Sequence, residues 1–518
     1  MEHDTKAPSR PHIIFFLADD LGWNDVSFHG SRQIPTPNID ALAAHGVVLQ
    51  RHYATPVCSP SRAAFMTARY PTRVGIGYMA LQPASKAALP LNIEVLPQWL
   101  KRQGYSTHMV GKNDICGLDF WRSVGHTTQA VTDLNGTYST YVFTDEAKRI
   151  IAEHDSKKPL FLYLSYQAVH SGCKDCDVEA PEEVVDRFAY IKAHNRTLFA
   201  GALHLMDRSI GDVLEALQSR GMLADSIVVF ASDNGGAPMK DSVASNAGSN
   251  WPLRGVKENV WEGGVRTPAV FWYGRLSDRL PLPPSQQMIH ITDWAPTFYA
   301  AAGGDVSALG DVDGMDQWEA LSSGTGTGHE DLILEIEGRN QASAIISGRY
   351  KLVNRSLAQS DPLLDSRLPR PEGDPPEELD LDTLMKSSKT WCALQQASID
   401  AGACDQSVPR EKWREELVLT CNGDPDSKKN EQITENFDPY DTAFVFDIIS
   451  DPCELNNLAA SEPQLRDKLL SKLVKIRAKI PINPMTAEED ERGYPQHHEC
   501  AWSTWLDVEP AEYQTCAC

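Results

Sequence analysis

The chain has 518 residues, of which 42% are hydrophobic and 23% charged, and this composition is typical of a globular protein long enough for two domains. Its formal net charge of −23 leaves no basic stripe that could neutralise phosphates, which argues against a nucleic acid partner. An anionic substrate must therefore be bound locally, by a few well-placed cations.

The sequence contains no apolar run of membrane-spanning length, since the richest run covers only residues 13–18. No signal peptide precedes that run, so we expect that a leader has been removed or is missing from the gene model. Eleven cysteines, seven of them after residue 390, nevertheless predict disulfide bonds in an oxidising compartment. The glycosylation sequons at Asn135, Asn195 and Asn354 point to the same compartment.

The run over residues 13–18 predicts a buried strand, and Asp19 and Asp20 follow it directly. Ligands of open α/β sheets gather beyond the carboxyl ends of the strands, where a pair of carboxylates suits Ca²⁺ or Mg²⁺. The alternative is a solvated turn. The next predicted element is a helix between Thr36 and Gly46.

Cys58 stands at a transition from strand to helix and is followed at fixed spacing by Pro60 and Arg62. If Ser59 caps this helix, Cys58 lies just before the helix N-terminus, where backbone N–H groups favour an anion. Arg62 would then face the same anion. The alternative is a buried structural cysteine.

Two further strands are predicted to carry polar residues at their carboxyl ends. A helix over residues 91–103 leads into a strand over residues 105–110, so that Lys112 lies just past the strand end. A second apolar strand over residues 160–166 is followed by His170. A histidine in this place is either a structural residue or a functional one.

A long helix over residues 197–218 precedes an apolar strand over residues 226–231, which ends just before Asp233 and Asn234. The first strand and this one therefore present four oxygen-bearing side chains, those of Asp19, Asp20, Asp233 and Asn234. No histidine or thiolate cluster accompanies them, so the set predicts a hard divalent cation rather than zinc.

After about residue 330 the pattern changes to that of a smaller antiparallel unit. Residues 344–353 predict a hairpin, residues 444–447 a later strand, and residues 465–480 a closing helix. The stretch 358–440 is rich in Pro, Asp, Glu and Cys and has little periodicity. We interpret it as an insertion held by disulfide bonds.

The Cys-x-Pro-x-Arg run that begins at Cys58 resembles the signature of type I sulfatases. Residues 18–23 resemble the opening of that family, and residues 250–268 nearly spell its lysine loop, with Lys257 at the position that contacts the sulfate. The resemblance extends over about residues 11–480 and is closest to arylsulfatase B-like members.

The resemblance implies an α/β fold of the alkaline-phosphatase-like type, with a mixed sheet flanked by helices and a smaller C-terminal α+β domain. We therefore expect a catalytic domain over residues 11–330 and a smaller domain over residues 331–518, with the insertion at about 358–440. It also implies a lysosomal or secreted protein.

In the family, the cysteine matched by Cys58 is oxidised to formylglycine by the formylglycine-generating enzyme, and the aldehyde hydrates to a diol. One diol oxygen attacks sulfur, and deprotonation of the other then expels sulfate, which is a form of covalent catalysis. The implied substrate is an anionic sulfated small molecule or sugar, including the sulfated sugars of glycosaminoglycans.

The resemblance also assigns roles to individual residues. Cys58 becomes the nucleophile after modification, Arg62, Lys112 and Lys257 hold the sulfate, and His170 is the candidate for proton transfer. The implied cation is Ca²⁺ in preference to Mg²⁺, and its implied ligands are Asp19, Asp20, residue 58, Asp233 and Asn234.

The sequence departs from the family directly after Lys112, where Trp-His-Leu-Gly is expected and residues 113–120 contain no histidine. One hypothesis is a working sulfatase that acts on sulfated sugars. The other is a catalytically impaired sulfatase-fold protein that binds anions, because losing one positioned donor costs about 10²–10³ in rate. A phosphomonoesterase is disfavoured, since such enzymes use Ser or Thr with a zinc-rich site that the sequence lacks.

Overall fold

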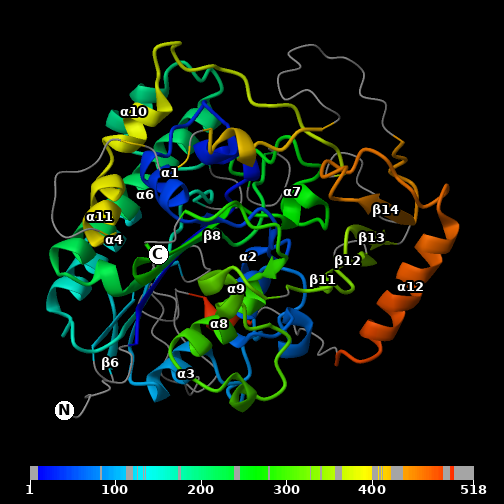
Figure 1. Ribbon diagram of the computed structural model, residues 1–518, viewed down its shortest axis with the longest axis horizontal. Helices are drawn as coiled ribbons and strands as arrows, with labels where there is room; N and C mark the ends of the chain where they lie inside the picture. The colour runs from blue at the N-terminus through cyan, green and yellow to red at the C-terminus, as the bar shows by residue number, and fades with distance from the viewer. Residues whose placement is uncertain are drawn as a thin grey trace.

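Within the described residues, the chain forms a large mixed sheet covered by helices and a separate antiparallel sheet (Figure 1). None of the helices in this part of the chain combines the length and apolarity needed to cross a membrane. The computed structural model describes residues 10–81, 84–112, 121–124, 127–131, 133–134, 136–172, 177–238, 245–277, 281–326, 328–338, 341–355, 365–398, 407, 410, 412–421, 436–481 and 490–494.

The large sheet has six strands. They are β1 (His12–Ala18), β2 (Val47–Val48), β4 (Ser106–Gly111), β7 (Leu160–Ser165), β8 (Ser226–Ser232) and β9 (Ala269–Tyr273). Their order is β2-β9-β8-β1-β7-β4. Four neighbouring strands, β8, β1, β7 and β4, are parallel to one another. Strand β9 is antiparallel to β8, and β2 is antiparallel to β9. The three central strands β8, β1 and β7 are wholly buried, which explains why they read as continuous apolar runs.

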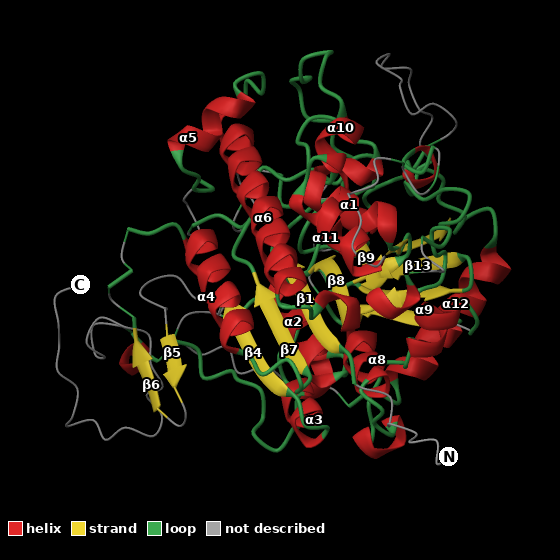
Figure 2. Cartoon of the chain, turned by 60° about the vertical axis from the view of Figure 1, so that its left-hand side comes forward, coloured by secondary structure: helices red, strands yellow, loops and turns green. Residues whose placement is uncertain are grey.

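Helices cover both faces of this sheet (Figure 2). One face carries α1 (Pro37–His45), α4 (Ser139–Glu153) and α6 (His194–Ser219), and the other carries α2 (Cys58–Thr67), α3 (Leu96–Arg102) and α8 (Trp294–Ala301). Successive side chains of a strand point to opposite faces, so β1 supplies both cores.

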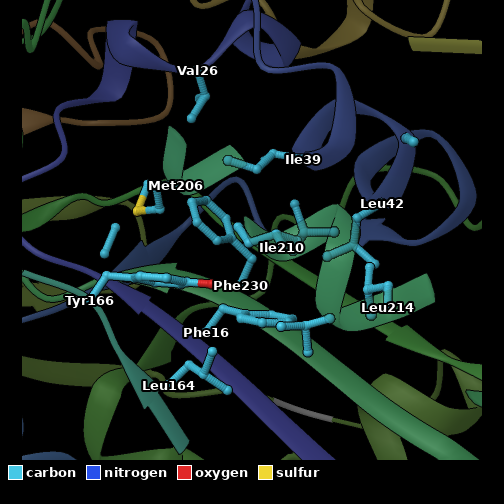
Figure 3. Packing of buried hydrophobic residues seen from close by; sticks show 14 of the residues in the cluster. Phe16, Val26, Ile39, Leu42, Leu164, Tyr166, Met206, Ile210, Leu214 and Phe230 are labelled. Carbon is cyan, nitrogen blue, oxygen red and sulfur yellow. The ribbon is translucent and has the colours of Figure 1, made fainter. Parts of the chain in front are cut away.

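The two cores meet across β1. Phe16 packs on one face with Ile39 of α1 and Ile210 of α6 (Figure 3). Phe15 packs on the other face and stacks on Phe65 of α2, with 4.4 Å between the ring centroids. This packing fixes α2, and hence Cys58, relative to the carboxyl end of β1.

The smaller sheet is antiparallel, in the order β11-β12-β13-β14 given by β11 (Asp331–Glu335), β12 (Ser343–Ser347), β13 (Tyr350–Asn354) and β14 (Ala443–Asp447). Helix α12 (Pro463–Arg477) covers one face through Leu469 and Leu473. The other face packs on Trp261 and Val265, which come from the chain between β8 and β9. Together the two sheets confirm the predicted fold class.

Among its described residues, the predicted insertion over residues 358–440 contains the α-helices α10 (Leu381–Lys386) and α11 (Lys389–Ser398). Trp391 and Leu394 of α11 join the core formed by α1 and α6 of the large sheet. A disulfide bond between Cys421 and Cys453 ties the segment to the turn after β14. Helix α11 of the insertion therefore packs on the large-sheet part of the chain, although its sequence follows the start of the smaller sheet.

Most element boundaries agree with the sequence to within three residues, and two expectations are wrong. Helix α3 begins at Leu96 rather than at residue 91, because Ile93 closes a turn onto the Pro90 carbonyl and Val95 is extended. Helix α2 includes Cys58, so the cysteine is its first residue rather than the residue before it.

The remaining elements are short. They are β3 (His52–Tyr53), β10 (Ile289–His290), β5 (Trp121–Val124), β6 (Thr127–Ala130), α5 (Glu182–Val185), α7 (Glu262–Val265) and α9 (Trp318–Ser323). Strand β3 leads into the segment before Cys58, and α7 lies within the predicted lysine loop of residues 250–268, after Lys257.

Candidate active site

The parallel strands end at one edge of the large sheet, and their polar residues meet there. Asp19 and Asp20 follow β1, and Asp233 and Asn234 follow the neighbouring strand β8. The backbone N–H of Asp20 donates to Asp233 Oδ1 at 3.1 Å, and Asn234 Nδ2 donates to Asp20 Oδ1 at 2.7 Å. The two pairs, more than two hundred residues apart in sequence, therefore lie side by side at this edge.

Cys58 is buried at the N-terminal end of α2, which the extended residue Val57 precedes. Ser59 does not cap this helix, which corrects the sequence-based expectation: its hydroxyl accepts the backbone N–H of Leu81 at 3.1 Å. The turn before the helix is closed instead by Ser61, whose hydroxyl accepts the backbone N–H of Thr55 at 3.0 Å.

Arg62, one turn after Cys58, is tied to the carboxylates. Its Nη2 lies 2.7 Å from Asp233 Oδ2 and 3.7 Å from Asp19 Oδ1. Its Nη1 donates to the hydroxyl of Ser165, the last residue of β7. Arg62 thus joins α2 to the ends of three strands. Sequence reasoning missed Ser165, although a polar residue at the end of an apolar strand is a usable signal.

Two lysines approach the carboxylates from different segments. Lys112, just past β4, places its Nζ 2.5 Å from Asp19 Oδ2. Lys257 places its Nζ 2.6 Å from Asp20 Oδ2 and 3.3 Å from His170 Nε2. Both lysines and His170 therefore lie beside the carboxylates at the edge of the sheet. Residues 113–120, which carry the predicted departure from the family, lie outside the described residues.

The carboxylates of this site are buried, and burial dominates their ionisation. It raises the pKa of Asp233, and the charge of Asp19 raises it further, to about 7, against the opposing charge of Arg62. Burial also disfavours the ionised form of Asp19, but Lys112 and other cationic neighbours hold its pKa well below its usual range. Carboxylates this close repel one another and favour additional positive charge.

Burial and neighbouring charges also shift the pKa values of the basic groups. Burial lowers the pKa of His170, and the charge of Lys112 lowers it further. Burial also lowers the pKa of Lys257, but Asp20 and the thiolate form of Cys58 outweigh it, so the net shift is upward. Lys257 thus interacts electrostatically with both Cys58 and the Asp20 carboxylate.

The donor set fits a hard divalent cation. Ligand atoms of Asp19, Asp20 and His170 lie within 4.8 Å of one another. Asn234 Oδ1 is buried and finds no hydrogen-bond partner among the described residues, while its Nδ2 is held by Asp20. An unsatisfied buried oxygen beside carboxylates is the arrangement that Ca²⁺ or Mg²⁺ completes. The place of His170 in this group was not predicted.

Two asparagines that sequence reasoning missed hold the backbone of the site. Asn246 Nδ2 donates to the Asp20 carbonyl at 2.8 Å and to the Val169 carbonyl at 3.1 Å. Asn250 exchanges two hydrogen bonds with the backbone of Gly236, at 2.8 and 2.9 Å. These bonds fix the loops after β1, β7 and β8 relative to one another.

Comparisons with known proteins agree with this geometry. A family model described as Sulfatase matches residues 11–304. Arylsulfatase J of Mus musculus is 30% identical over 553 residues, covering 98% of this chain and 82% of the mouse protein. N-acetylgalactosamine-6-sulfatase of Mus musculus is 29% identical over 394 residues, covering 67% of this chain and 72% of that protein.

Among solved structures, that of Ps i-CgsB in complex with k-i-k-neocarrahexaose matches with a TM-score of 0.65 and 22% identity. The match covers 92% of this chain and 95% of the other. At this level of identity the likeness concerns the fold, and it agrees with the predicted alkaline-phosphatase-like architecture.

Proposed function

Because the chain belongs to the sulfatase family, we propose that it hydrolyses sulfate esters with a nucleophile derived from Cys58. The predicted family is thus confirmed, and the arylsulfatases among its relatives agree loosely with the predicted similarity to arylsulfatase B-like members. The name N-acetylgalactosamine-6-sulfatase supports sulfated sugars as the substrate class.

One observation carries the proposal: Cys58, three buried carboxylates and three cationic side chains meet at a single edge of the sheet. The carboxylates are those of Asp19, Asp20 and Asp233, and the cationic side chains are those of Arg62, Lys112 and Lys257. The charges balance within the chain, so a divalent cation would leave the site with the positive charge that an anionic sulfate ester needs.

Two groups would complete the site. Oxidation of Cys58 by the formylglycine-generating enzyme would supply a hydrated aldehyde, whose hydroxyl oxygen is the attacking atom. A Ca²⁺ ion, favoured over Mg²⁺, would be held by Asp19, Asp20, Asp233, Asn234 and residue 58, and would polarise the sulfate oxygens.

Side chains of the protein bind the sulfate, position residue 58 and supply the proton. Lys112 and Lys257 bind the non-bridging sulfate oxygens, and Arg62 holds α2 so that residue 58 faces the sulfur. The bond between sulfur and the alcohol oxygen breaks, and that oxygen takes up one proton. His170, which lies 3.3 Å from Lys257, is the candidate donor.

The alternative is a protein that keeps the cation and anion sites but turns over poorly. It is favoured by the sequence after Lys112, which lacks the family's histidine although Lys112 itself lies in the site beside Asp19. Losing one positioned donor costs about 10²–10³ in rate.

One experiment tests the function. The protein would be produced through the secretory pathway, where we propose that it is routed to lysosomes or secreted. The peptide containing Cys58 is then expected to be about 18 Da lighter, because an aldehyde oxygen replaces the thiol. Sulfate release from a small aryl sulfate and from sulfated N-acetylgalactosamine would be measured beside Cys58→Ala. Ser59→Ala, which keeps the Cys-x-Pro-x-Arg spacing, is the matched control.

The outcomes separate the two hypotheses. An unmodified thiol in secreted protein contradicts the proposed nucleophile. Modified protein that releases sulfate faster once a Trp-His-Leu-Gly segment follows Lys112 supports the impaired alternative. Equal rates with and without that segment support a working sulfatase.

A further inference from the structure

A buried charge network joins the smaller sheet to the catalytic part of the chain. Lys351 of β13 is wholly buried, and its Nζ lies 2.9 Å from Glu262 Oε1 and 2.8 Å from Glu454 Oε1. Glu262 is the first residue of α7, and Glu454 lies in the turn after β14. One ammonium group thus bridges two carboxylates that come from different parts of the fold.

The network reaches both flanks of the loop that carries Lys257. On the C-terminal flank, the backbone N–H of Glu262 donates to Glu454 Oε2 at 2.8 Å. On the N-terminal flank, Arg254 Nε donates to the Glu454 carbonyl at 2.9 Å. The ends of the segment from 254 to 262 are therefore held by one residue of the smaller part, Glu454.

The network also reaches the segment that leads to Cys58. Tyr53 of β3 donates through its hydroxyl to Glu262 Oε2 at 3.0 Å. Arg266 Nη1 lies 3.4 Å from the same oxygen, and Arg266 Nε donates to the Gln50 carbonyl at 2.8 Å. Glu262 is therefore fixed between the loop of Lys257 and the chain before Cys58.

Close backbone contacts transmit this placement to the site. The backbone N–H of Gly235, next to Asn234, donates to the Gly264 carbonyl of α7 at 3.0 Å. A Cβ on Gly235 would lie 1.8 Å from the Gly263 carbonyl oxygen, so the two segments touch without intervening side chains. The backbone N–H of Lys257 donates to the Gly236 carbonyl at 3.0 Å. A shift of α7 would therefore move both Lys257 and the loop of Asp233 and Asn234.

Apolar packing already holds the two parts together, so the charges are not needed for adhesion. Trp261 and Val265 pack against Leu334, Val353 and Phe446 of the small sheet. Buried ion pairs gain little net free energy because desolvating the ions costs about as much as their attraction returns. Their bonds are directional, however, and they specify one position of α7 on the sheet.

We propose that Lys351 and Glu454 are positioning residues for sulfate-ester cleavage, acting through Glu262 to hold the lysine loop against the ends of β1 and β8. The catalytic part of this inference rests on the proposed function. Removing Lys351 leaves two buried carboxylates, with Arg266 as the cation that remains beside them in the described part of the chain. The loop then loses its defined position, and Lys257 is displaced from Asp20. A misplacement of about 1 Å costs about 10²-fold in rate.

The test compares Lys351→Met with the double variant Lys351→Met/Glu454→Gln, in which the net charge of the network equals that of the wild type. Lys472→Met is the matched control, because Lys472 on α12 pairs with Asp331 at 2.5 Å in the same part of the chain but is partly exposed. Amide hydrogen exchange and kcat with a small aryl sulfate would be measured on the full-length, formylglycine-bearing protein.

We expect selectively faster exchange over residues 254–266 and a fall in kcat of about 10- to 100-fold in Lys351→Met, with Lys472→Met unchanged. The double variant should regain thermal stability without regaining protection of residues 254–266 or kcat. If Lys351→Met does not fold, hydrogen exchange over residues 254–266 and kcat of the double variant alone test the proposal.

Three results would overturn the proposal. They are unchanged exchange over residues 254–266, an increase spread evenly over the chain including β1 and β8, and recovery of kcat together with stability in the double variant. If the wild-type protein itself releases no sulfate, the proposed function fails, whereas the exchange measurement still decides whether Lys351 positions the loop.

Discussion

Replacing Lys257 by Met should affect turnover and cation affinity in opposite directions. Lys257 Nζ lies 2.6 Å from Asp20 Oδ2, and the side chain is almost completely buried. In turnover it is a positioned donor to the sulfate, and the loss of one such donor costs about 10²–10³ in rate. We therefore expect kcat/KM for a small aryl sulfate to fall by that factor.

The cation should bind more tightly to the same variant. In the wild-type protein, the ammonium group of Lys257 competes with a cation for the Asp20 carboxylate. A hydrogen bond to a charged group is worth about 1.5–3 kcal/mol, and about 1.4 kcal/mol corresponds to a factor of ten. Removing this competitor should therefore tighten Ca²⁺ binding by about 10- to 100-fold.

Isothermal titration with Ca²⁺ and steady-state kinetics of sulfate release would measure the two effects on the same preparation. Lys389→Met is the control, because Lys389 pairs with Asp212 at 2.8 Å on the surface, about half exposed. Folded Lys257→Met protein with near wild-type turnover, or with weaker Ca²⁺ binding, would refute the assignment of Lys257 to both the sulfate and Asp20.

Three further predictions concern the cation, one buried acid and the disulfide bond. Chelation should lower the melting temperature and abolish activity, because a cation bound to the buried carboxylates stabilises the folded state. Ca²⁺ should restore both better than Mg²⁺, since it is the ion favoured for this donor set. A melting temperature that does not change with chelator would contradict this prediction. Burial raises the pKa of Glu335 to about 8, so the folded protein keeps a proton that the unfolded chain loses above its usual pKa, and stability should fall as pH rises towards 8. Relative to Glu335→Gln, the loss should approach about 1.4 kcal/mol per pH unit in denaturant titrations, and parallel pH curves would disprove it. Replacing Cys421 and Cys453 by Ser should cost about 3–4 kcal/mol, because the bond closes a loop of 32 residues, and an unchanged midpoint of unfolding would show that the loop is already ordered without it.

The sequence alone determined the elements whose signals are local. Buried parallel strands read as apolar runs, so β1, β7 and β8 were placed to within a residue or so. Because parallel strands end at one edge of a sheet, the meeting of Asp19 and Asp20 with Asp233 and Asn234 also followed from the sequence. The resemblance carried by Cys58, Pro60 and Arg62 predicted the family before any contact was known.

The tertiary structure decided what depends on contacts between distant segments. The pairing of Lys112 with Asp19 and of Lys257 with Asp20 depends on how three loops pack, which no spacing encodes. The cap predicted at Ser59 was wrong because its hydroxyl accepts a hydrogen bond from the backbone N–H of Leu81, which lies 22 positions later.

The same reason explains the insertion and the charge network. Residues 358–440 showed little periodicity, yet Trp391 and Leu394 complete the core of α1 and α6, because a partly apolar helix is stable once a partner face exists. From the sequence, Lys351 was only one residue of a predicted hairpin. Only the fold brings it between Glu262 and Glu454, since a buried charge is stable only where opposite charges from other segments surround it.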